Sequence, residues 1–143
     1  MLIGKYQNNM DAKKRVPIPA KFRDLLGKTV IITRGLEDCL FVYSMADWQE
    51  FADKLSKLPL SQESARSFAR LMFSGAMEVE LDDLGRVLIP EYLKSHAQLK
   101  KEAVIIGAGN RLEIWDKEKW EKYQMNETGD MSETVADLKE FGL

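Results

Sequence analysis

The residues best suited to chemistry form two copies of one short motif, an aspartate followed four positions later by an arginine. The first copy is Asp11–Arg15 and the second is Asp82–Arg86, and each is followed by an apolar run that ends in Ile-Pro. An aspartate that begins a tight turn accepts hydrogen bonds from backbone N–H groups two residues on. The arginine can pair with that aspartate or direct its planar set of donors outward. The motif therefore predicts either an internal Asp–Arg clamp or a ligand-binding loop.

Positive charge gathers around the first motif. Residues 1–36 carry eight Lys or Arg and two Asp, whereas residues 124–143 carry five acidic residues and one Lys. Such segregation indicates that one end meets a polyanion, although an uneven solvated surface gives the same pattern. Two basic loops side by side suit a polyanion better than a small substrate. The expected contact residues are Lys13, Lys14, Arg15, Lys21, Arg23 and Arg86, with Asp11, Asp82 and Gly85 shaping the turns.

Groups of residues typical of enzymes are not found in this sequence. His96 and Cys39 are the single histidine and cysteine, and neither has neighbours at metal-ligand spacing. We expect His96 to be a partly exposed helix residue and Cys39 a buried apolar one. Residues 107–109 lack the third glycine of a dinucleotide-binding loop and predict a hairpin. We therefore expect no enzymatic activity, metal, cofactor or small-molecule substrate. We also expect no membrane span and no secretory signal, which places the chain in the cytoplasm.

The two motifs belong to a duplicated unit of about 45 residues. The motif residues match at a constant offset of 71 positions, Val30–Ile32 is aligned with Val104–Ile106, and Leu40–Ser44 with Leu112–Asp116. Each unit is expected to contain a strand, the turn, a second strand, a helix that begins at the proline, and two more strands. Such a unit buries too little apolar surface to fold alone. We therefore expect the two units to intertwine into one pseudo-twofold barrel.

Further helices are expected between and after the units. An apolar stripe predicts one helix up to Pro59 and a second from about Ser61, and Ser44 and Asp116 are expected to begin helices. Val135, Leu138 and Phe141 have the spacing of a short amphipathic helix, although this end of the chain could equally be frayed. The predicted class is α+β. The predicted organisation is a first unit at 5–47, a helical insert at 48–75, a second unit at 76–122 and an acidic tail at 123–143.

At these residues the sequence resembles the MraZ family of bacterial transcriptional regulators, within the AbrB-like swapped-hairpin superfamily. The matching stretches are the two motifs, Pro19–Arg23, Thr33–Leu36, Phe73–Ala76 and Leu112–Trp115. The resemblance implies a DNA-binding regulator, usually a repressor, that engages direct repeats in the promoter of the division and cell-wall gene cluster, which includes its own gene. It also implies homo-oligomeric rings on the nucleoid, and it assigns DNA binding to Arg15 and, through the repeat, to Arg86.

One position departs from the family pattern. Lys14 stands where the first motif usually has glycine, while the second motif keeps Gly85. If the turn requires a positive φ, Lys14 is strained; otherwise the turn differs. The added charge could instead strengthen a phosphate contact. Because lysines flank only the first motif, we expect the first turn to be the stronger DNA contact and the second to be mainly structural.

Two other classes of function stay open at this stage. The chain could be a structural or adaptor protein that builds a ring, with the charged loops serving contacts between subunits. It could also be an antitoxin-like protein of the AbrB fold. Such antitoxins usually have one unit and a long disordered tail, whereas this chain has two units and a tail of about 20 residues.

Overall fold

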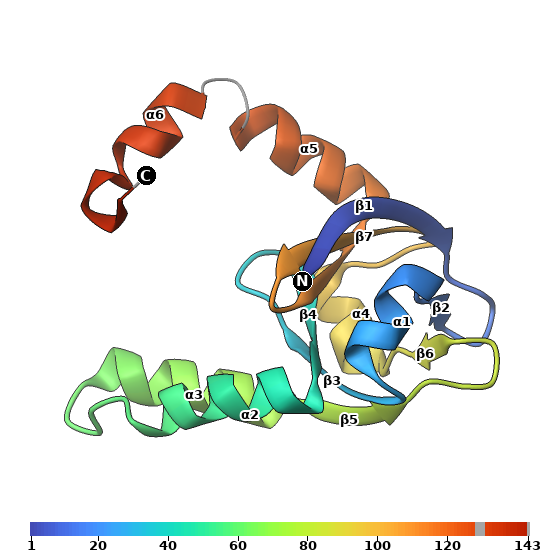
Figure 1. Ribbon diagram of the computed structural model, residues 1–143, viewed down its shortest axis with the longest axis horizontal. Helices are drawn as coiled ribbons and strands as arrows, with labels where there is room; N and C mark the ends of the chain where they lie inside the picture. Colours follow the sequence, from blue (N-terminus) through green and yellow to red (C-terminus); the bar gives the residue numbers. More distant parts are fainter. Residues whose placement is uncertain (128–130, 143) are drawn as a thin grey trace.

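The computed structural model describes residues 1–127 and 131–142 and has the predicted α+β class (Figure 1). One antiparallel sheet has six strands in the order β1-β7-β8-β4-β3-β5, and a separate ribbon pairs β2 with β6. The strands are β1 Leu2–Asn9, β2 Arg15–Pro17, β3 Thr29–Arg34, β4 Cys39–Ser44, β5 Met77–Glu80, β6 Arg86–Leu88, β7 Glu102–Gly109 and β8 Leu112–Asp116. The helices are α1 Ala20–Leu26, α2 Met45–Ser56, α3 Glu63–Gly75, α4 Glu91–Ala97, α5 Lys117–Glu127, α6 Met131–Ala136 and the 3-10 helix η1 Lys139–Phe141.

Strand pairing repeatedly joins the two halves of the chain. The first strand of each half pairs with a strand of the other half, β1 with β7 and β5 with β3. The short strands that follow the two motifs pair with each other as β2 and β6. The hydrogen-bonded order ends at β1 on one side and β5 on the other, so the pairing alone describes an open sheet. The closed barrel stays a prediction.

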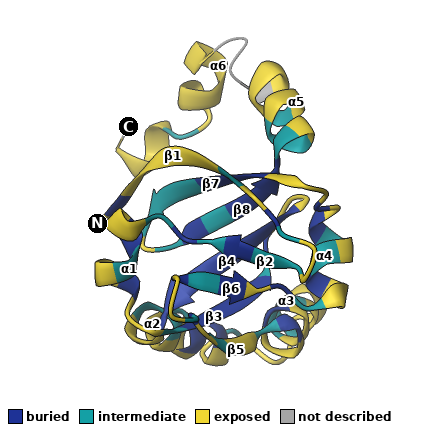
Figure 2. Cartoon of the chain, turned by 90° about the vertical axis from the view of Figure 1, so that its right-hand side faces the viewer, coloured by how far each residue is buried: buried dark blue, intermediate teal, exposed yellow. Residues whose placement is uncertain are grey.

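Two apolar clusters lie on opposite faces of the sheet. The inner cluster includes Ile18, Phe22 and their repeat counterparts Ile89 and Leu93, all of which are essentially inaccessible to water. It packs α1, α4 and the β2–β6 ribbon against the sheet. Figure 2 shows β4 of the sheet buried and the two ribbon strands only partly buried. The outer cluster brings side chains of α2, α3 and α5 onto the other face around Tyr43. The inner cluster is therefore the shared core that supports both motifs.

The structural repeat corrects one part of the sequence alignment. Val30 lies opposite Ser44, and Ala103 lies opposite Asp116, the residue equivalent to Ser44. Val30–Ile32 therefore corresponds to Ala103–Ile105, and the alignment with Val104–Ile106 is wrong by one residue. Successive strand residues face opposite sides of a sheet, so a one-residue shift exchanges inward and outward positions. The identical residue types Val-Ile-Ile favoured the wrong register, because apolar residues occupy both faces of these strands.

The expected helices are confirmed, with small differences at their ends. Ser44 caps α2 by accepting a hydrogen bond from the backbone N–H of Asp47 at 3.1 Å, and α5 begins directly after Asp116. The insert's second helix, α3, begins at Glu63, two residues later than expected. Of the predicted acidic tail at 123–143, residues 123–127 end α5, residues 128–130 and 143 lie outside the described residues, and the rest forms α6 and η1, which bury none of their residues. The short helix predicted through Val135, Leu138 and Phe141 is interrupted, because Leu138 lies between α6 and η1.

The remaining expectations from single residues are also tested by the fold. Residues 107–109 end β7, and the chain turns into β8 as a hairpin, as predicted. Cys39 is fully buried, and burial raises the pKa of its thiol to about 12, which makes it a poor nucleophile at neutral pH. His96 is a half-buried residue of α4. Across the described residues, no helix is long and apolar enough to cross a membrane.

Candidate functional site

The first motif folds into a tight turn built around the carboxylate of Asp11. Its Oδ1 accepts hydrogen bonds from the backbone N–H groups of Lys13 at 2.9 Å and Arg15 at 3.0 Å. Its Oδ2 accepts a third hydrogen bond from Nε of Arg15 at 2.7 Å. The backbone closes the turn in both directions, from Asp11 N to Arg15 O and from Lys14 N to Asp11 O. The aspartate therefore fixes the loop and the arginine together.

The second motif repeats this geometry. Oδ1 of Asp82 accepts hydrogen bonds from the N–H groups of Leu84 at 3.0 Å and Arg86 at 2.9 Å, and Oδ2 accepts one from Nε of Arg86 at 2.7 Å. The Asp–Arg clamp expected from the sequence is thus present in both turns. It does not hide the arginines, because the side chains of Arg15 and Arg86 remain 30% and 24% exposed.

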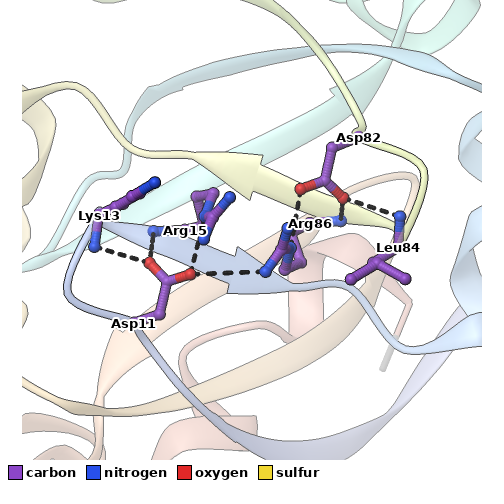
Figure 3. Close-up of polar contacts among 6 residues, drawn as sticks. All are labelled: Asp11, Lys13, Arg15, Asp82, Leu84 and Arg86. Carbon is purple, nitrogen blue, oxygen red and sulfur yellow. Dashed lines mark hydrogen bonds and ion pairs between the residues drawn. The ribbon is translucent and has the colours of Figure 1, made fainter.

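The two turns are joined into one structure. Val16 lies opposite Val87 in the β2–β6 ribbon, and reciprocal bonds run from Ile18 N to Gly85 O and from Ile89 N to Lys14 O. Figure 3 shows the two arginines side by side, with a guanidinium nitrogen of Arg86 3.6 Å from Oδ2 of Asp11. The ribbon therefore places the two motifs against each other, as the repeat predicted.

Both aspartates titrate below their ordinary range. The backbone N–H of Arg15 is the main cause that lowers the pKa of Asp11, and the N–H of Arg86 has the same effect on Asp82. Partial desolvation opposes this effect, while the arginine side chains reinforce it. Both carboxylates are therefore ionised at neutral pH, and each partly neutralises the arginine that it holds.

The fourth position of each turn has a positive φ. Gly85 has a φ of 75° and Lys14 a φ of 62°, so Lys14 adopts the left-handed conformation that glycine normally provides. Of the two possibilities raised by the sequence, a strained lysine or a different turn, the structure has the strained lysine. The Lys14 ammonium forms an ion pair with Glu91 at the start of α4, which lowers the pKa of that carboxyl.

The other expected contact residues differ in their placement. Lys13 and Lys21 are exposed. Arg23 is half-buried, donates from Nε to the carbonyl of Ile18 at 2.8 Å, and lies against the backbone of Gly85 so closely that a Cβ there would overlap its guanidinium. The structure thus gives Arg23 a structural contact with the second turn.

Sequence reasoning missed Glu91 and this position of Arg23. The signals were faint: Glu91 follows the motif's proline, and Arg23 lies only four residues after the first Ile-Pro. Neither spacing shows that each helix reaches the opposite turn. Among the described residues, no group of His, Cys, Asp and Glu could hold a metal ion.

The fold and the site together define a duplicated α+β protein with paired Asp–Arg turns on a shared ribbon. The chain matches the profile of the family described as "MraZ protein, putative antitoxin-like" at residues 1–71 and again at 72–141. The chain belongs to the MraZ family.

Relatives match along their whole length. Proteins named "Transcriptional regulator MraZ" from Alkaliphilus metalliredigens and Alkaliphilus oremlandii are 46% and 48% identical over 143 residues, covering 100% of both chains. The protein of that name from Lactobacillus delbrueckii subsp. bulgaricus is 47% identical with the same coverage. Among solved structures, the solution structure of PHS018 from Pyrococcus horikoshii matches with a TM-score of 0.30 and 16% identity, covering 80% of this chain and 88% of that one.

Proposed function

We propose that this chain is a sequence-specific DNA-binding transcriptional regulator whose contact surface is the pair of Asp–Arg turns. The observation that carries the proposal is the juxtaposition of two clamped arginines beside the exposed Lys13, on a ribbon shared by both halves. Basic groups on adjacent loops supply the phosphate contacts that dominate affinity for DNA. The names of the full-length relatives support a regulator.

Arg15 is the residue that we assign to base recognition. Its Nε is held by Asp11 at 2.7 Å, and among the described residues its two terminal nitrogens make no hydrogen bond. A guanidinium fixed at one nitrogen presents its remaining donors in a set direction, which suits a bidentate contact with a base edge. Lys13 and Lys21 are assigned to phosphates. Lys14 and Arg86 are assigned as auxiliary contacts, because the Lys14 ammonium pairs with Glu91 and a terminal nitrogen of Arg86 lies 3.6 Å from Asp11, whereas Arg15 pairs through its Nε.

The finer parts of the proposal concern assembly and target. We infer that the two halves intertwine as a pseudo-twofold barrel, and that several copies form a ring in the cytoplasm on the nucleoid. The ring would engage direct repeats in the promoter of the division and cell-wall gene cluster, including the protein's own gene, and repress it. Each subunit offers few contacts, so a ring on repeated sites would gain affinity through effective concentration.

An electrophoretic mobility shift on DNA upstream of the protein's own gene tests the proposal. Arg15→Ala should weaken binding by about 1–3 kcal/mol if Arg15 reads a base edge. If it touches only phosphate, the slope of log affinity against log salt should fall by about 1 per subunit. Lys100→Ala, which removes an exposed lysine paired with Glu118, is the control and should bind as wild type.

A charge-reversal variant, followed by mobility shift and by its oligomeric state, separates DNA binding from the structural alternative. If the charged loops serve contacts between subunits, reversing the charge of Lys13 and Arg15 breaks the oligomer, and no DNA sequence is preferred. Binding of Arg15→Ala that equals wild type in both affinity and salt slope would refute the assignment of Arg15.

A further inference from the structure

The first turn carries a lysine whose charge is neutralised by the other half of the chain. The Lys14 ammonium pairs with the carboxylate of Glu91, the first residue of α4. The two side chains are 42% and 63% exposed, so the pair lies at the surface of the protein. Because the lysine lowers the pKa of the Glu91 carboxyl, both partners are charged at neutral pH. The ion pair is therefore formed at neutral pH and is open to solvent.

The backbone on both sides of Glu91 is held in place. Two residues earlier, Ile89 donates its N–H to the carbonyl of Lys14 at 2.8 Å. One residue later, the Tyr92 hydroxyl donates to the carbonyl of Gly75 at 2.9 Å, which ties the start of α4 to the end of α3. The position from which the carboxylate reaches the lysine is thus fixed by contacts with both halves of the chain.

The equivalent place in the other turn has neither charge. At the repeat offset of 71 residues, Lys14 corresponds to Gly85 and Glu91 corresponds to Ala20. The same backbone hydrogen bond forms there, from Ile18 N to Gly85 O at 2.9 Å. The fold therefore does not require the ion pair. The lysine and the carboxylate occur together in one of two equivalent places, and both are missing from the other.

Stability does not explain the lysine either. Lys14 has a φ of 62°, and this left-handed conformation costs free energy in any residue that has a Cβ. An exposed ion pair stabilises little, so it offsets only part of that cost. Lys14 lies between Lys13 and Arg15, to which the proposed function assigns a phosphate and a base edge. Its charge is thus placed where it would meet DNA, together with a carboxylate that competes for it.

We propose that Glu91 is a specificity-determining residue, which holds Lys14 so that this lysine contacts phosphate only when the first turn is seated on its target DNA. The inference rests on the proposed function. Phosphate contacts carry no sequence information, so a free lysine would strengthen binding to every duplex. On random DNA no base contact seats the turn, and Glu91 keeps the ammonium. On target DNA the base contact of Arg15 brings the turn against the DNA backbone, where the exposed pair is exchanged for a phosphate at little cost.

Mobility shifts of full-length variants on a promoter duplex and on a random duplex of equal length test this inference. Glu91→Ala introduces the residue that the equivalent position already has, so folding should be unaffected. On random DNA it should tighten binding roughly three- to fivefold and steepen the slope of log affinity against log salt by about 0.9 per subunit in contact. On promoter DNA the gain in affinity should be smaller, and the slope should stay as in wild type.

Two further variants separate this effect from general electrostatics, because removing any carboxylate near DNA also weakens repulsion. Asp83→Ala removes an exposed carboxylate from the second turn and should change the affinity for both duplexes by the same factor. In a Lys14→Ala background, Glu91→Ala should likewise lose its preference for random DNA, because no lysine is released. The difference between the two backgrounds measures the coupling of Glu91 to Lys14.

Three outcomes would overturn the inference while leaving the proposed function intact, provided that the wild-type protein prefers the promoter duplex. They are unchanged binding of Glu91→Ala to random DNA, equal gains on the two duplexes, and the same gain with and without Lys14. A wild-type protein with no preference for the promoter duplex would instead refute the proposed function, and this inference with it.

Discussion

The two Asp–Arg turns share a backbone but differ in what holds them. In both, the aspartate accepts two backbone N–H groups and the arginine Nε at nearly equal distances. They differ at the fourth position, where the first turn has Lys14 and the second has Gly85. Gly85 leaves room for Arg23 of α1, whereas Lys14 extends its side chain to Glu91 of α4. Each turn is therefore secured by the helix of the opposite half.

This difference shows how a duplicated unit can divide its roles. The carboxylate clamp is kept in both copies because it forms the turn that the β2–β6 ribbon requires. The neighbours of the clamp have diverged: one turn is covered by a half-buried arginine, and the other displays the exposed Lys13. The symmetric backbone thus supports an asymmetric surface, and on this difference rests the proposal that the first turn binds DNA while the second mainly stabilises the fold.

The largest effect on stability is expected from giving the second turn the lysine that the first turn has at its fourth position. Gly85→Lys places a side chain at a φ of 75° and forces the guanidinium of Arg23 away from the turn. Backbone strain and overpacking together should lower the free energy of unfolding by about 2–3 kcal/mol. Urea denaturation measures the loss. Asp83→Lys, at an exposed position of the same turn, changes the charge by two units rather than one and should still cost little.

An equal loss in Gly85→Lys and Asp83→Lys would contradict this account, because it would assign the effect to charge. Gly85→Ala refines the test, since it adds only the Cβ. It should already produce most of the loss if the contact with Arg23 is the cause.

Alanine substitution of the two arginines should separate an effect on stability from an effect on DNA binding. Arg86 donates to Asp82 and lies 3.6 Å from Asp11, so it connects both turns, whereas within residues 1–127 and 131–142 Arg15 forms its ion pair with Asp11 alone. Arg86→Ala should therefore lower the melting temperature by several degrees, and by more than Arg15→Ala. In the promoter binding assay the order should reverse. Calorimetry and mobility shift on the same preparations compare the two, and the same rank order in both assays would remove the proposed division of roles.

Much of this comparison was predictable from sequence, because it rests on short-range patterns. The D-x-x-x-R spacing, the Ile-Pro helix starts and the Ser44 cap each act within a few residues, and the structure has them as expected. The duplication then implied that the two turns are related. Turn and helix-cap preferences depend on a few neighbouring residues, so they can be predicted without knowledge of the tertiary fold.

The parts that failed or were missed depend on contacts between distant residues. The one-residue error at Val30–Ile32 arose because apolar letters do not reveal which face of a strand they occupy. Arg23 reads as a surface base in the sequence, yet it packs on Gly85, which lies 62 positions away. The ion pair between Lys14 and Glu91 spans 77 positions. Such pairings are set by how the halves dock, which single-sequence patterns do not encode.

A smaller effect is expected from restoring glycine in the first turn. Lys14→Gly relieves the left-handed conformation of a residue with a side chain and should raise the free energy of unfolding by about 1 kcal/mol. The lost ion pair with Glu91 is exposed, so it should offset little of this gain. Lys14→Ala is the control: it removes the charge but keeps the strain, and it should not stabilise. Urea denaturation that shows equal stability for both variants would mean that strain at position 14 is negligible.

The smallest effect on stability at neutral pH is expected from neutralising the aspartate of either turn, and this effect should depend on pH in both turns. The folded-state pKa of Asp11 and of Asp82 lies below the ordinary value of 3.8, mainly because of the N–H groups of Arg15 and Arg86. A depressed folded pKa means that the stabilisation is fully present above the unfolded value and is lost as the pH falls through the folded one. Asp11→Asn should therefore be less stable than wild type at pH 7, and the gap should close below about pH 4. Asp82→Asn should show a narrower gap, because Asp11 faces two guanidinium groups and Asp82 one. Urea midpoints at a series of pH values measure both gaps. A gap for Asp11→Asn that stays constant into acid would show that the ionised carboxylate does not stabilise the turn, and equal gaps for the two variants would show that Arg86 does not link them.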